Sequence, residues 1–114
     1  MDRQHEIQTL IKVFRDYRKG LCDYAIKRLA AIGADAIPAL IHTFQYDDDH
    51  TPKFAAVTLR KMGAQAIPAL LKARHHRERR IAWGAAWVLA SIPEAREFVL
   101  AAAPVELAQP AAEA

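Results

Sequence analysis

The chain has little cysteine, few aromatic residues and no long hydrophobic run, and each shortage excludes a class of protein. Cys22 is the only cysteine among 114 residues, so no disulfide can form within the chain. The apolar runs fall short of the roughly 18 residues that a membrane-spanning helix needs, and residues 1–5 do not resemble a signal peptide. We therefore expect a cytoplasmic location and no membrane partner.

Motifs for catalysis and for cofactor binding are also missing. The sequence has no glycine-rich phosphate loop, no nucleophile elbow and no pair of carboxylates on an apolar face. Asp47–Asp49 and the five histidines lack the spacing of known zinc or calcium sites. The sequence therefore predicts a protein that is not an enzyme, with no catalytic residue, no bound metal and no cofactor.

The overall composition is that of an ordinary globular domain. Hydrophobic residues make up 53% of the chain and charged residues 25%, which is enough apolar material for one modest core. The net charge of +3 is mildly basic and by itself too weak to predict a nucleic-acid partner.

A repeat with a period of thirty residues is the strongest signal in the chain. Gly-Ala-Asp-Ala-Ile-Pro-Ala-Leu at 33–40 recurs as Gly-Ala-Gln-Ala-Ile-Pro-Ala-Leu at 63–70. A fixed period in this range is typical of stacked supersecondary units. The repeat therefore predicts a layered fold.

The equivalent positions of the repeat hold apolar side chains that are spaced by three and four residues, as on one face of a helix. Gly33 and Gly63 suit the end of one helix, and Pro38 and Pro68 suit the first turn of the next. Thr51 reads as the N-cap of a further helix. The principal apolar columns are Ala25, Ala55 and Ala85; Leu29, Leu59 and Leu89; Ile7, Ile37 and Ile67; and Leu10, Leu40, Leu70 and Leu100.

Seven helices are expected, of which the first acts as a capping element and the other six form three pairs. They make up one helical domain over 1–102, followed by an alanine- and proline-rich flexible tail over 103–114. The expected helices lie near 4–18, 21–32, 35–46, 51–62, 65–75, 79–91 and 94–102.

These residues resemble HEAT repeats, in the short form of about thirty residues found in phycobilisome-lyase-like proteins. The resemblance rests on Ala55-Ala56, Leu59, Met62-Gly63 and 66–70, and on their counterparts one period earlier. It covers roughly residues 5–101 and implies an all-α, right-handed α-solenoid of antiparallel helix pairs. The arginine that often follows the first residues of each unit in this family is replaced by Cys22, Pro52 and Ala82, so its ladder of ion pairs is absent.

Two groups of basic residues are candidate partner-binding sites. Lys12, His42 and Lys72 share a column on the helices that usually line the concave face of such arrays, and neighbouring helix axes lie about 8–10 Å apart. Arg77, Arg79 and Arg80 crowd a loop on the same edge as Asp47–Asp49. Two interpretations stay open: the acidic loop neutralises the arginines, or the arginines bind an acidic partner.

Trp83 and Trp87 are a third candidate site. They lie four residues apart on one helix, in columns that hold Asp23 and Lys53, and Lys27 and Val57, in the earlier units. The register therefore predicts a partly exposed aromatic pair, which is typical of a contact surface. In the alternative interpretation, a tilt of this unit or folding back of the tail places the tryptophans in the core.

The sequence therefore favours a protein-binding module or small scaffold. Its partner is another protein or a second copy of the chain, bound through the concave face or through Trp83 and Trp87. Two other functions stay open. One is an accessory subunit of a bilin lyase, which the family resemblance alone implies. The other is weak nucleic-acid binding through the basic residues.

Overall fold

The computed structural model describes residues 2–17 and 20–95, and every regular secondary-structure element within them is a helix. The α-helices are α1 (Arg3–Asp16), α2 (Leu21–Ile32), α3 (Ile37–His42), α4 (His50–Met62), α5 (Ile67–Ala73) and α6 (Arg79–Ser91). Three short 3-10 helices flank α3 and α5: η1 (Gly33–Ala36), η2 (Thr43–Gln45) and η3 (Gly63–Ala66).

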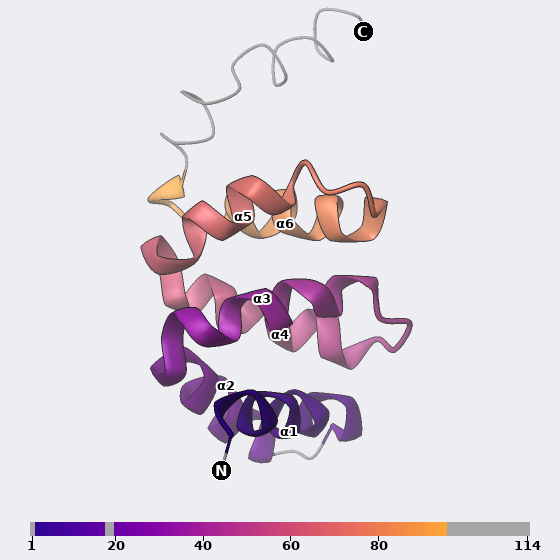
Figure 1. The fold of residues 1–114 in the computed structure, drawn as a ribbon, viewed down its shortest axis with the longest axis vertical. Coiled ribbons are helices and arrows are strands. Elements are labelled where there is room, and N and C mark those ends of the chain that lie inside the picture. The colour runs from indigo at the N-terminus through magenta and orange to yellow at the C-terminus, as the bar shows by residue number, and fades with distance from the viewer. Residues whose placement is uncertain (1, 18–19, 96–114) are drawn as a thin grey trace, which may run out of the picture.

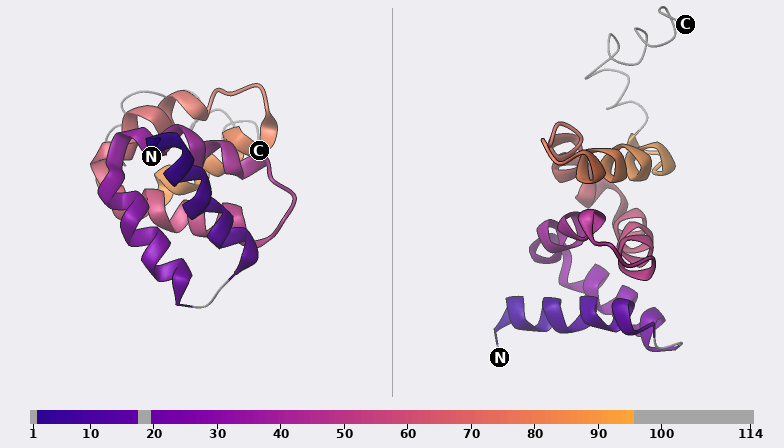
Figure 2. Two further views of the ribbon diagram at one scale, coloured as in Figure 1. Left: turned by 60° about the horizontal axis from the view of Figure 1, so that its bottom comes forward. Right: turned by 90° about the vertical axis from the view of Figure 1, so that its right-hand side faces the viewer.

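The α-helices pack in pairs, and the pairs lie one above another along the long axis of the molecule. Figure 1 shows α1 with α2, then α3 with α4, then α5 with α6, and the side view of Figure 2 shows the same three layers. Between layers, α2 contacts α4 and α4 contacts α6, while α3 contacts both α1 and α5. The helices therefore form two rows, α1–α3–α5 and α2–α4–α6.

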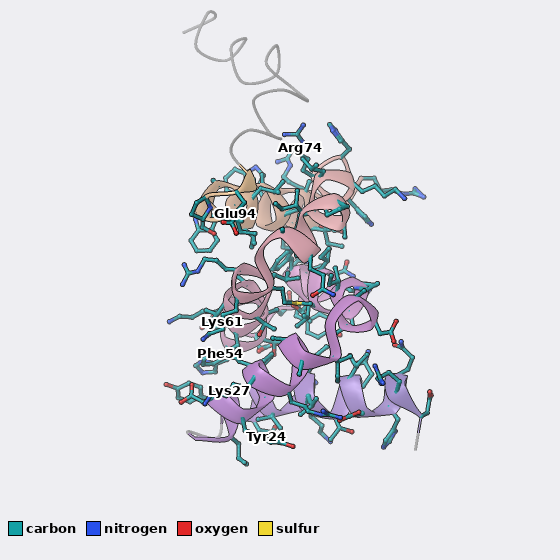
Figure 3. All side chains as sticks on the ribbon, turned by 90° about the vertical axis from the view of Figure 1, so that its left-hand side faces the viewer. Tyr24, Lys27, Phe54, Lys61, Arg74 and Glu94 are labelled. Atoms are coloured by element: carbon teal, nitrogen blue, oxygen red, sulfur yellow. The ribbon has the colours of Figure 1, made fainter. Side chains whose placement is uncertain are left out.

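The α2–α4–α6 row presents its own outer face, which carries the candidate site. In Figure 3, Tyr24 and Lys27 of α2 and Phe54 and Lys61 of α4 follow one another along this side of the molecule. Tyr24 and Phe54 occupy equivalent positions of successive layers, thirty residues apart.

The helix ends use glycine and proline as the sequence indicates. Gly33 and Gly63 have φ of 81° and 61°, a region that glycine adopts without the clash that a Cβ would cause. Each also lies under the next layer: a Cβ on Gly33 would come within 2.9 Å of the Gln65 amide, and one on Gly63 within 3.4 Å of the Glu94 carboxylate. The two glycines therefore both turn the chain and allow layers to approach.

The core follows the repeat columns. Leu29, Leu59 and Leu89 are at most 1% exposed, and the isoleucine and leucine columns of α1, α3 and α5 are buried with them. Burying one such side chain contributes about 1.5–3 kcal/mol. The register therefore assigns the core correctly across all three layers.

Several predicted boundaries differ from the structure. The expected helices at 35–46 and 65–75 each begin with a 3-10 turn, because a tight turn lets the chain reverse direction within the glycine-containing octet. The prediction that Thr51 caps α4 is wrong. The helix already begins at His50, and the Asp48 carboxylate accepts the bond from the Thr51 N–H at 2.8 Å.

The C-terminal predictions fall largely beyond the part of the chain that is described. Of the seventh expected helix, near 94–102, the structure describes only Glu94 and Ala95, and the expected tail at 103–114 lies outside the described residues. No helix within residues 2–17 and 20–95 combines the length and apolar composition needed to cross a membrane.

Candidate functional site

An apolar groove of about 680 Å³ runs between α4 and α6, on the outer face of their row. Its volume lies within the range of typical ligand pockets. Its walls are mainly hydrocarbon and aromatic carbon, and basic side chains surround them. The lining residues described are Phe44, Pro52, Lys53, Ala56, Val57, Arg60, Arg79, Arg80, Trp83, Gly84 and Trp87.

Trp83 and Trp87 form the α6 wall of the groove. They are 78% and 64% exposed, and their spacing of four residues places both on one face of the helix. The prediction of a partly exposed aromatic pair is therefore confirmed. Trp side chains are usually well buried in folded proteins, so two so exposed and adjacent mark a candidate contact surface.

The floor of the groove depends on a close approach between Phe44 and Gly84. A Cβ on Gly84 would lie 2.5 Å from Cγ of Phe44, so the Phe44 ring packs directly on the backbone of α6. Phe44 is only 8% exposed and belongs to the core. The absence of a side chain at Gly84 thus leaves the space between Val57 and the tryptophans open.

The basic side chains lie along both walls. Lys53 and Arg60 are seven residues apart on α4, which is about 10.5 Å along the helix axis, and Arg79 and Arg80 stand at the start of α6. Arg80 donates to the Asp47 carboxylate at 2.9 Å and lies 3.8 Å from that of Glu78. Among the described residues that line the groove, none is acidic. The groove therefore has a positive rim.

The acidic loop neutralises only part of the predicted basic cluster. Asp47 pairs with Arg80, whereas Asp48 turns toward α4 and accepts from Thr51 Oγ1 at 2.6 Å. Burial opposes ionisation of Asp48, but the bonds from Thr51 and the charge of Arg15 outweigh it and lower the pKa of Asp48. In the described part of the chain, no ion pair links this loop to Arg77 or Arg79.

The other predicted basic residues stand apart from the groove. Lys12, His42 and Lys72 are exposed on α1, α3 and α5, and α3 contacts both of its neighbours, as the register requires. Lys12 borders a separate hollow of about 240 Å³ beside Tyr46, and His42 Nε2 lies 2.7 Å from the Gln45 amide. No polar interaction joins the three side chains to one another within the described ranges.

Metal and thiol chemistry have no candidate site in residues 2–17 and 20–95. No group of three or more His, Cys, Asp or Glu side chains there is arranged to hold a metal ion. Cys22 is 5% exposed, and its Sγ points toward the Val13 carbonyl at 3.9 Å. Burial, with the charge of Asp23, raises the pKa of the Cys22 thiol, which suits a buried apolar residue rather than a nucleophile.

The sequence predicts the residues of the α6 wall of the groove but not those of the α4 wall or the floor. Trp83, Trp87, Arg79 and Arg80 were predicted, but Lys53, Val57, Arg60, Phe44 and Gly84 were not. A signal was present in the register, where the column of Tyr24 and Phe54 continues as Gly84. Loss of a large aromatic side chain at one position of a repeat predicts a local gap.

Comparisons with family models, with curated proteins and with solved structures found no significant match to this chain.

Proposed function

We propose that the chain is a HEAT-like, right-handed α-solenoid that acts as a protein-binding module through the groove between α4 and α6. The layered helix pairs and their thirty-residue register support the solenoid. One observation carries the binding role: two tryptophans, 78% and 64% exposed, line an apolar groove of about 680 Å³. Exposed tryptophan is enriched among the residues that dominate binding energy at protein interfaces.

The groove is a better candidate than the column of Lys12, His42 and Lys72. These three side chains are exposed, and neither His42 nor Lys72 lines either of the two hollows described above. The groove offers both apolar area and a pocket, and binding energy comes chiefly from residues that lose their water in such pockets. The proposal therefore places the partner on the α4–α6 side.

Loss of partners from a charge substitution in the groove tests this function. The 114-residue chain, with or without Trp83→Glu, is used to capture proteins from a native extract, and the captured proteins are quantified by mass spectrometry. Tyr24→Glu is the matched control because Tyr24 is 59% exposed on α2, outside the groove. We expect Trp83→Glu to lose partners that wild type and Tyr24→Glu retain.

The same variants separate a foreign partner from a second copy. Sedimentation of the wild-type chain alone gives its mass in solution, and Trp83→Glu should lower that mass if two copies pair through the groove. Equal capture and equal mass for all three chains would contradict a binding role for the groove.

A further inference from the structure

We infer that the groove between α4 and α6 binds an acidic amphipathic segment of another protein, docked along the groove as a helix. This inference rests on the proposed function and names the chemistry of its partner. Three features of the groove carry it: the sign of its rim, the composition of its floor and the spacing of its cations.

The rim selects for negative charge. Lys53, Arg60 and Arg79 line the groove without an ion-pair partner among the described residues, and Arg80 adds a fourth cation that Asp47 and Glu78 partly neutralise. Such a rim attracts an acidic partner and repels a basic one. It also disfavours a second copy of this chain, because pairing two identical grooves would bring the two positive rims together.

The floor selects for apolar side chains. Phe44, Ala56, Val57 and the backbone at Gly84 form it, and none of these side chains offers a hydrogen bond. Leucine, isoleucine or phenylalanine would lose water there without leaving a polar atom unpaired. The polar edges of nucleic-acid bases would not find partners on such a floor, although Trp83 and Trp87 could stack on base faces. A peptide therefore fits better than a single-stranded nucleic acid.

The spacing of the cations fits a helix. Lys53 and Arg60 lie two turns apart on α4, with Ala56 and Val57 between them. A docked helix with acidic residues seven positions apart could reach both cations. Apolar residues at the intervening third and fourth positions would then face the floor and the tryptophans.

Intrinsic fluorescence reads occupancy of the groove directly, since Trp83 and Trp87 are the only tryptophans in the chain. The probes are two tryptophan-free amphipathic peptides of about four helical turns with the same leucine face. One carries glutamates and the other lysines at the polar positions. With the 114-residue chain at low ionic strength, we expect a saturable blue shift with the acidic peptide and at least about tenfold weaker binding of the basic one.

A matched pair of charge reversals locates the effect. Arg60→Glu changes a cation of the groove, while Arg77→Glu makes the same change of net charge at an exposed loop residue that does not line it. We expect Arg60→Glu to weaken binding of the acidic peptide about tenfold and Arg77→Glu to change it less than about twofold at moderate salt. Both side chains are exposed, and far-ultraviolet circular dichroism confirms that both variants are folded.

The possible results distinguish this inference from the proposed function. Equal binding of both peptides, abolished by Trp87→Glu, would overturn the acidic preference and leave a peptide-binding groove. Tighter binding of single-stranded oligonucleotide than of the acidic peptide would overturn the inference in favour of nucleic acid. Concentration-dependent dimerisation that buries the tryptophans without peptide would assign the groove to a second copy. No fluorescence response to either peptide would also overturn the inference, and the capture experiment would then decide the proposed function separately.

Discussion

The α2–α4 and α4–α6 junctions are built from equivalent positions of one repeat, but only the second forms the groove. At the first junction, the Phe14 ring of α1 stacks on the Phe54 ring of α4 with the centroids 5.4 Å apart, and Tyr17, directly after α1, packs on Phe54 at 5.8 Å. At the second, Phe44 occupies the position of Phe14, and Gly84 replaces Phe54. The replacement of Phe54 by Gly84, together with that of Tyr17 by Asp47, therefore separates an aromatic-filled junction from an open one.

The comparison also shows how side chains on the outer face can differ between layers while the helix packing stays the same. Helices α4 and α6 keep their contact, and Ala55, Ala85, Leu59 and Leu89 stay buried in both layers. Since each layer contacts only its neighbours, substitutions on the outer face can vary while the core columns stay fixed. We expect the first junction to contribute to stability and the second to binding.

The largest expected difference between the junctions is the stability lost on removing an aromatic ring. Phe14 is fully buried, so Phe14→Ala should lower the free energy of unfolding by about 3–5 kcal/mol. Trp83 is 78% exposed, so Trp83→Ala should change it by about 0.5 kcal/mol or less. Urea denaturation followed by circular dichroism measures both. A large loss for Trp83→Ala would mean that the tryptophans are part of the core.

The second prediction concerns Gly84, where the two junctions diverge. Alanine normally stabilises a helix interior relative to glycine, but here its Cβ would lie 2.5 Å from Cγ of Phe44. Since Cγ is fixed close to the backbone, we expect Gly84→Ala to destabilise the chain by about 1–3 kcal/mol. Phe44→Leu should relieve part of that penalty, and a double-mutant cycle measures the coupling. Additive effects of the two substitutions would show that Phe44 does not press on α6.

The register explains why the core columns could be predicted from the sequence. Columns such as Leu29, Leu59 and Leu89 hold a buried apolar side chain in every layer. The recurrence of the same residue type at each period therefore strengthens the prediction that the column is core. The predicted pairing is wrong: the helix near 4–18 was expected to stand alone as a capping element, but α1 packs with α2, α3 with α4 and α5 with α6.

The helix start at His50 was missed because Asp48, three residues before Thr51, supplies the cap, and acidic residues at 47, 48 and 49 look alike in sequence. The structure distinguishes them by their partners, since Asp48 bonds to Thr51 and Asp47 to Arg80.

The α4 wall of the groove could not be predicted because it depends on contacts between layers. Phe44 reaches Gly84 across forty residues, and whether Val57 stays accessible depends on how closely α6 approaches α4. The tryptophans were identifiable because they break the polarity of their columns. Gly84, in the same column as Phe54, also breaks its column, because it removes a large side chain. That this change opens the groove is apparent only from the structure, which places the Phe44 ring against Gly84.

The third prediction concerns the loop that enters α4, between the two junctions. Asp48→Ala removes the acceptor of the Thr51 N–H and should destabilise the chain by about 1 kcal/mol. Because the pKa of Asp48 is lowered in the folded state, its contribution is present above the unfolded pKa of about 3.9 and is lost as pH falls through the folded value. Denaturation as a function of pH should show this loss in wild type and not in Asp48→Ala. An equal pH response in both chains would contradict the cap.

The smallest expected effect on stability is that of Asp47→Asn, which acts on the second junction alone. Its ion pair with Arg80 is highly exposed, so the free energy of unfolding should not change measurably. The substitution nevertheless releases Arg80 toward the groove, and the acidic peptide should bind about twofold to fivefold more tightly at low ionic strength. Asp16→Asn is the matched control because Asp16 is an exposed acidic residue at the end of α1, outside the groove. Equal gains for the two variants would indicate a general effect of net charge, whereas a gain confined to Asp47→Asn would show that Arg80 belongs to the binding rim.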